Sequence, residues 1–142
     1  MNKEDMIYYI EHQMKEMGMF VSIHDSDINI ASFIWNKVDR KRAHIKLNPA
    51  RFTREEFLAV ALHELGHAQM YAKYTTLGYI RGTNEWHELG AWNIALRHAE
   101  SLGIKLPKEY IISCLTSYGI GNSQIEGMLS QWNNSLYSLS FA

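Results

Sequence analysis

The strongest constraint on the fold is a segment of about twenty residues, Arg54 to Tyr74, that has the pattern of a buried helix. Thr53 and Glu56 stand at capping-box spacing, in which each side chain satisfies a free backbone N–H of the first helical turn. Apolar side chains then cover most of the helix circumference, namely Phe57, Leu58, Val60, Ala61, Leu62 and Leu65. The sequence therefore predicts a central helix on which the rest of the chain packs.

The residues before this helix change from helical to strand periodicity. Residues 5–19 carry apolar side chains at helical spacing and predict a first amphipathic helix. The segments that follow alternate apolar with polar residues or are rich in β-branched and aromatic ones, which favours strands. We place strands around residues 21–23, within 28–38 and at 43–48, with a turn at 39–42. The pattern predicts a small antiparallel sheet of about three strands.

Glycine and proline residues divide the chain after the central helix. Gly78 and Gly82 indicate a loop. Asn84 is a suitable N-cap for a further helix that extends to about Leu102. Pro107 indicates a helix start, and two weaker helical patterns follow it. We therefore expect an α+β fold in which the small sheet and the further helices pack on the central helix.

Length and composition fit a single domain that spans residues 1–142. Hydrophobic residues make up 46% and charged residues 20%, as in ordinary globular proteins. No apolar run approaches the roughly 18 residues of a membrane span, and no apolar segment of a secretory signal follows the charged amino terminus. A single cysteine, Cys114, cannot form an internal disulfide, which suits a reducing compartment. We expect a cytoplasmic protein with no membrane partner.

The overall charge is nearly balanced, but basic residues gather before the central helix. The formal net charge of -1 at pH 7 argues against a dedicated nucleic-acid binder. Seven of the 14 basic residues nevertheless fall between Lys37 and Arg54. A solvated hairpin explains this cluster. The alternative is an acidic or nucleic-acid-bound partner that docks beside a cleft.

The central helix contains the sequence His63-Glu64-Leu65-Gly66-His67. Residues four apart lie on the same helix face, so both imidazoles can reach one metal ion. Imidazole nitrogen is a good zinc ligand, and a catalytic zinc site has three protein ligands and one open position. Glu64 lies one step round the helix, where it can accept a proton from water without being a ligand. The spacing predicts one Zn²⁺ per chain, with His63 and His67 as ligands and Glu64 as the general base.

The surroundings of the motif favour a metal over two histidines that are satisfied by their neighbours. Ionisable groups in so apolar a helix are costly to bury unless they are paired or bound to metal. Gly66 also costs about 1 kcal/mol relative to alanine in a helix. A glycine is explained there if another backbone or a ligand approaches the helix closely.

The third ligand should come from the next helix, where Glu85 and Glu88 compete. Glu88 shares a face with apolar residues that must point to the core, namely Ala91, Trp92, Ala95, Ala99 and Leu102. Glu85 lies in the first turn, where the helix dipole alone favours a carboxylate. We therefore predict Glu88 as the third ligand. His87 and His98 lie off the apolar face and are expected at the surface.

The two helices together resemble the ImmA/IrrE-type zinc metallopeptidases, a gluzincin-like group. That group pairs a His-Glu-x-x-His helix with a later Glu-x-x-Ala…Ala helix, to which the run Glu88-Leu89-Gly90-Ala91-Trp92-Asn93-Ile94-Ala95 is similar. The resemblance spans roughly residues 43–102 and implies a minimal zincin-like domain. It also implies the roles of the site residues: zinc ligands His63, His67 and Glu88, with Glu64 as the base.

This resemblance implies a zinc metalloendopeptidase that hydrolyses peptide bonds of a protein substrate. Members are typically encoded by bacteria, phages and mobile elements, and some cleave helix-turn-helix repressors, so a DNA-binding repressor or regulator is a candidate substrate. Two other classes stay open. One is a catalytically silent zinc-binding regulatory or interaction module on the same scaffold, against which the intact Glu64 argues. The other is a metal-free α+β interaction protein.

A peptidase site also needs an oxyanion donor and a surface that binds the substrate. Three tyrosines follow the motif closely, and the sequence does not choose among them: Tyr71, Tyr74 and Tyr79. The strand at residues 43–48 directly precedes the central helix and is expected to form the rim of the cleft, where it pairs with an extended substrate. Its outward polar face would consist of His44, Lys46 and Asn48.

Overall fold

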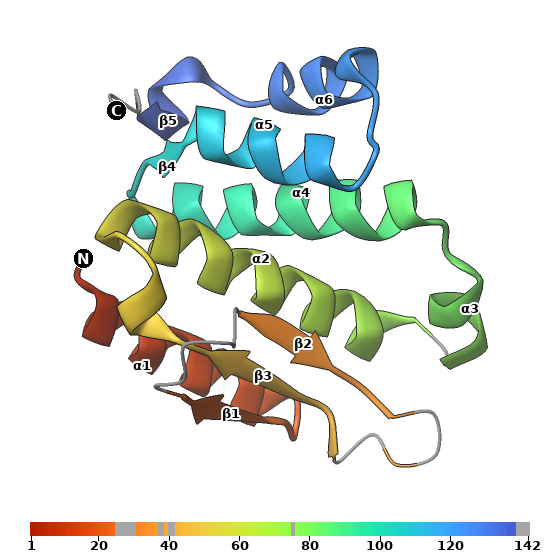
Figure 1. Ribbon diagram of the computed structural model, residues 1–142. Coiled ribbons are helices and arrows are strands. Elements are labelled where there is room, and N and C mark those ends of the chain that lie inside the picture. Colours follow the sequence, from red (N-terminus) through yellow and green to blue (C-terminus); the bar gives the residue numbers. More distant parts are fainter. Residues whose placement is uncertain (25–30, 37–38, 40–41, 75, 139–142) are drawn as a thin grey trace.

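The computed structural model describes residues 1–24, 31–36, 39, 42–74 and 76–138, and it combines helices with small sheets (Figure 1). The α-helices are α1 (Lys3–Glu16), α2 (Arg54–Lys73), α3 (Thr76–Arg81), α4 (Asn84–Leu102), α5 (Lys108–Ser117) and α6 (Asn122–Leu129). The strands are β1 (Phe20–Ile23), β2 (Ser32–Ile34), β3 (His44–Leu47), β4 (Leu106–Pro107) and β5 (Tyr137–Ser138). Short 3-10 turns occur at η2 (Pro49–Arg51) and η3 (Asn134–Leu136). The predicted α+β class is confirmed.

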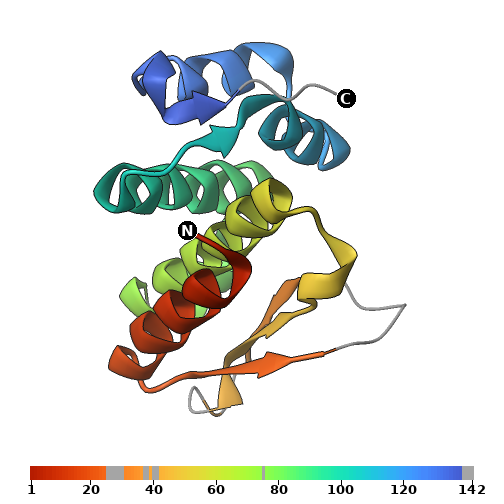
Figure 2. The same ribbon diagram turned by 90° about the vertical axis from the view of Figure 1, so that its left-hand side faces the viewer.

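Helix α2 occupies the middle of the molecule, as the sequence predicts. Figures 1 and 2 show α1 and the three-stranded sheet on one side of α2, and α4 with α5 and α6 on the other. The capping box of Thr53 and Glu56 is present, and every residue from Phe57 to Gly66 is buried. The most extensive contacts of α2 are with α4, followed by those with α1. This helix therefore forms the centre of the hydrophobic core.

The three-stranded sheet is mixed, so the expectation of an antiparallel sheet is wrong. Its strand order is β1-β3-β2. Strand β3 runs antiparallel to β2 but parallel to β1. The reason is the order of the strands along the chain: β2 reverses the direction between β1 and β3, and β3 then inserts between the two. Pairing of consecutive strands, which the sequence pattern suggested, holds only for β2 and β3.

The central position of β3 also corrects its expected role. Strand β3 is paired on both edges, so it has no free edge for an extended substrate, and the prediction of a rim at residues 43–48 is wrong. Strand β2 lies at an edge of the sheet instead. The predicted outward face is only partly present, because His44 and Lys46 are half-buried whereas Asn48 is 1% exposed.

Several element boundaries in the structure differ from those that the sequence predicts. Helix α1 begins at Lys3 behind an Asn2 cap and ends at Glu16. The predicted loop after α2 contains the short helix α3, because burial of Tyr79 compensates for a glycine within it. The N-cap of α4 is Thr83 rather than Asn84. Parts of the predicted strand at 28–38 and of the turn at 39–42 lie outside the described residues.

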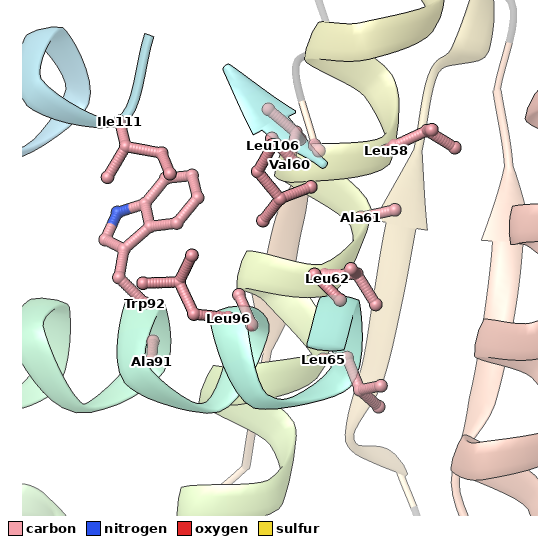
Figure 3. Close-up of a cluster of buried hydrophobic side chains, with 14 of the residues drawn as sticks. Leu58, Val60, Ala61, Leu62, Leu65, Ala91, Trp92, Leu96, Leu106 and Ile111 are labelled. Carbon is pink, nitrogen blue, oxygen red and sulfur yellow. The ribbon is translucent and has the colours of Figure 1, made fainter. Parts of the chain in front are cut away.

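Helices α2 and α4 approach each other closely at Gly66. A Cβ atom at this position would lie 2.3 Å from the carbonyl oxygen of Ala91. The prediction that another backbone approaches α2 here is confirmed. Figure 3 shows the surrounding core, in which Leu62 and Leu65 of α2 lie near α4 and Trp92 extends towards Ile111 of α5. Only glycine allows this packing without displacing a helix.

We expect Gly66→Ala to destabilise the fold by about 1–3 kcal/mol, the usual cost of forcing an extra group into a packed core. The matched control is Gly127→Ala on α6, where an added Cβ meets nothing within 4 Å. That variant should gain about 0.5–1 kcal/mol, because alanine favours a helix more than glycine does. Urea unfolding followed by circular dichroism measures both. Equal stabilities would contradict the close contact of α2 and α4.

Candidate metal centre

The structure brings together the three residues that the sequence predicts as metal ligands. His63, His67 and Glu88 each offer one ligand atom, and these atoms lie within 4.8 Å of one another. The two histidines come from successive turns of α2, and Glu88 comes from the face of α4 that packs against α2. Glu85 is exposed and lines a separate groove. The rotation of α4 thus agrees with the choice of Glu88 over Glu85.

Two of the three separations within this cluster are close to those of ligands around a small dication, and the third is a hydrogen-bond distance. Nε2 of His63 lies 3.1 Å from Nε2 of His67 and 3.3 Å from Oε1 of Glu88. Nε2 of His67 lies 2.7 Å from Oε2 of Glu88. Ligand atoms about 2.0–2.1 Å from a tetrahedral zinc stand roughly 3.3 Å apart. Two imidazole nitrogens and one carboxylate are also a donor set that zinc accepts with one position open.

Glu88 gives the clearest indication that a cation belongs at this place. Its side chain is only 3% exposed, and its Oε1 atom makes no hydrogen bond among the described residues although it faces Nε2 of His63 at 3.3 Å. A buried carboxylate that is not fully hydrogen-bonded is strongly unfavourable unless a positive charge compensates it. A metal ion held jointly with the two histidines would supply that charge.

The electrostatics of the cluster point in the same direction. Burial alone would lower the pKa of His63, but hydrogen bonds with Glu64 and Glu88, and the charges of these groups, raise it. Burial alone would raise the pKa of Glu88, but hydrogen bonds from His63 and His67 lower it. Both shifts mean that the site favours positive charge between the carboxylates, which a proton or a metal ion can provide.

The ring of His63 is held in place by an aromatic contact. It stacks on the indole of Trp92 with ring centroids 4.3 Å apart and planes 11° from parallel. Trp92 is fully buried and extends from α4 towards Ile111 (Figure 3). This stack fixes the imidazole plane, so that Nε2 stays directed at His67 and Glu88. Fixed ligands lose little conformational freedom when they bind a metal.

Glu64 lies beside the ligand cluster, between two hollows. A cleft of about 380 Å³ is lined by Glu64 together with His67 and Glu88. A smaller cavity of about 200 Å³ contacts Glu64 and His63 on another side. The Oε1 atom of Glu64 is 3.5 Å from Nδ1 of His63, the nitrogen that does not face the cluster. A carboxylate in this position is adjacent to the candidate metal site without belonging to its ligand triangle.

His87 and His98 are half-buried rather than fully exposed, and neither belongs to the ligand cluster of the described residues. His87 lines the cleft and contacts the ring of Tyr79 edge-on at 4.4 Å. Nδ1 of His98 hydrogen-bonds to the hydroxyl of Tyr9 at 2.5 Å, and its Nε2 lies 2.7 Å from Gln69. These neighbours come from helices α1, α2 and α3. The pattern of apolar residues along α4 therefore could not predict the contacts of His87 and His98.

A comparison with protein-family models, curated proteins and solved structures finds no match to this chain. Among the helices that the structure describes, none has the length and apolar character needed to cross a membrane. The geometry of the cluster and its motif are therefore the basis for assigning a function.

We expect Glu88→Ala to lower zinc affinity by orders of magnitude, because it removes a ligand and leaves two imidazoles. Glu85→Ala, on the same helix but exposed, is the matched control and should change zinc affinity little. Competition with a chromophoric chelator measures both affinities. Equal losses would point to a supporting role for Glu85, and the reverse ranking would refute the ligand assignment.

Proposed function

We propose that this protein is a zinc-dependent metalloendopeptidase of the ImmA/IrrE type, built on a minimal zincin-like domain in the cytoplasm. The observation that carries the proposal is the buried cluster of His63, His67 and Glu88 at a cleft, with Glu64 beside it. A purely structural ion cluster has no need of a cleft or of a second carboxylate at its edge. Perturbed ionisable groups grouped in a cleft are a common sign of an active site.

Each residue of the site has a defined task in peptide hydrolysis. His63, His67 and Glu88 would hold the zinc. Bound zinc supplies Lewis-acid activation of water and of the substrate carbonyl. Glu64 takes a proton from the attacking water and passes it to the leaving amine nitrogen as the C–N bond breaks. Such general acid–base catalysis typically contributes about 10²–10⁴-fold.

The shape of the site favours a polypeptide substrate. The cleft and the smaller cavity meet at Glu64, so side chains on the two sides of one peptide bond can enter different hollows. Strand β2 contributes Ser32 and Phe33 to the cleft wall, and its outer edge is unpaired within the described residues. An extended chain can pair with such an edge through its main chain, which requires little of its sequence.

The resemblance to the ImmA/IrrE group makes a DNA-binding repressor or regulator the candidate substrate. A catalytically silent zinc-binding module is the competing function. It would keep the metal ligands without using a base, and the position of Glu64 at the junction of both hollows argues against it. A metal-free interaction protein would have to compensate the buried carboxylate of Glu88 through protons on the neighbouring imidazoles, whereas one metal ion would do so with both histidines neutral.

We expect Glu64→Gln to keep its zinc but to lose at least about 100-fold of its peptide hydrolysis, because an amide does not accept a proton from water. Glu55→Gln, an exposed change on the same helix, is the control and should keep both properties. Metal analysis and cleavage of casein or of a tagged repressor provide the two measurements.

Three outcomes of this experiment count against parts of the proposal. Zinc loss in Glu64→Gln as large as in His63→Ala would make Glu64 a ligand or a structural residue. Full hydrolysis by Glu64→Gln would refute its role as the base. Zinc-loaded wild-type protein that cleaves no protein substrate would favour the silent module.

A further inference from the structure

Attack on a peptide bond places negative charge on the carbonyl oxygen, and a hydrogen-bond donor held in position stabilises that charge. The sequence leaves three tyrosines open for this task, and the structure separates them. The hydroxyl of Tyr71 donates a hydrogen bond to the carbonyl of Asn36 at 2.8 Å. Tyr74 is exposed and lines the groove on the other side of α4, away from the metal cluster. Neither has its hydroxyl at the cleft.

Tyr79 of α3 differs from both. It is only 4% exposed, and it lines the cleft together with Glu64, His67 and Glu88. Its hydroxyl makes no hydrogen bond within the described residues, and the residue belongs to the lining of the open cleft. The hydroxyl is not among the fully buried polar atoms that lack a partner, so water can accept its hydrogen bond until another acceptor enters the cleft. Such a group is suited to a partner that arrives with the substrate.

The surroundings of Tyr79 keep it protonated and rigid. Burial, followed by the charges of Glu64 and Glu88, raises the pKa of Tyr79, so the phenol remains a donor. Its ring makes edge-on contacts with Tyr71 at 5.3 Å and with Trp35 at 5.4 Å. A donor fixed in this way needs little reorganisation during the reaction.

We propose that Tyr79 is a catalytic residue that donates a hydrogen bond to the substrate carbonyl oxygen as this oxygen becomes negatively charged. The inference rests on the proposed peptidase function. Water oxygen bonds to the carbonyl carbon, and the carbonyl π electrons move to the oxygen that Tyr79 contacts. When the carbonyl re-forms, the C–N bond breaks and the amine receives the proton carried by Glu64. Tyr79 keeps its own proton throughout.

Tyr118 is the competing donor, because it lines both the cleft and the smaller cavity. It is 50% exposed, however, and no ring contact within the described residues holds its phenol. A mobile, solvated hydroxyl is a weaker stabiliser of developing charge than a fixed one. The test therefore compares single hydroxyl deletions at three positions: Tyr79→Phe, Tyr118→Phe and, as the exposed control outside the cleft, Tyr74→Phe.

In the zinc-loaded full chain, Tyr79→Phe should lower kcat by about 10²–10³-fold, the usual effect of removing one oxyanion donor. KM, zinc content and the unfolding midpoint should stay close to those of the wild type. A peptide phosphonamidate, whose tetrahedral anionic group imitates the charged intermediate, provides a readout independent of turnover. Its affinity should fall by a similar factor in Tyr79→Phe and change less than a few-fold in Tyr74→Phe.

Four results would overturn the proposal. The first is a kcat and a phosphonamidate affinity in Tyr79→Phe within a few-fold of the wild type. The second is a loss confined to Tyr118→Phe. The third is zinc loss or unfolding in Tyr79→Phe, which would make the residue structural. The fourth is a wild-type protein that cleaves no substrate and binds the phosphonamidate as tightly as Tyr79→Phe does. In that last case the peptidase function fails separately, because turnover and affinity are measured independently.

Discussion

The close contact between α2 and α4 at Gly66 is the constraint on which the candidate site depends. A Cβ at this position would lie 2.3 Å from the carbonyl oxygen of Ala91, so only glycine lets the two backbones meet. One turn before this contact, α2 carries His63 and α4 carries Glu88, which explains why their side chains lie 3.3 Å apart. A wider helix spacing would move the carboxylate away from both histidines. Core packing and site geometry therefore depend on one small residue.

The site also depends on parts of the chain outside the two motif helices. Trp92 fixes the ring of His63 and is itself packed towards Ile111 of α5 (Figure 3). The cavity beside Glu64 is lined in part by Tyr110 and Cys114 of the same helix. Because buried ionisable groups oppose folding when unpaired, a metal that binds them would also stabilise the arrangement of α2, α4 and α5.

Local patterns predicted the central helix and the position of Glu88, whereas long-range packing decided the rest. Helix α2 follows from a capping box and an apolar circumference, and Glu88 follows from the apolar stripe that orients α4. The order of strands in a sheet depends on contacts between distant segments. The insertion of β3 between β1 and β2 therefore could not be predicted from the local sequence pattern. The same holds for Tyr79, since its place in the cleft depends on how α3 packs against α2.

The metal content of the purified full chain, determined by mass spectrometry without exposure to chelators, tests the central claim most directly. Two imidazoles and a buried carboxylate at these separations predict about one tightly bound zinc per chain. A folded wild-type protein that carries no stoichiometric transition metal would contradict the account, because the buried charge of Glu88 would then need another explanation.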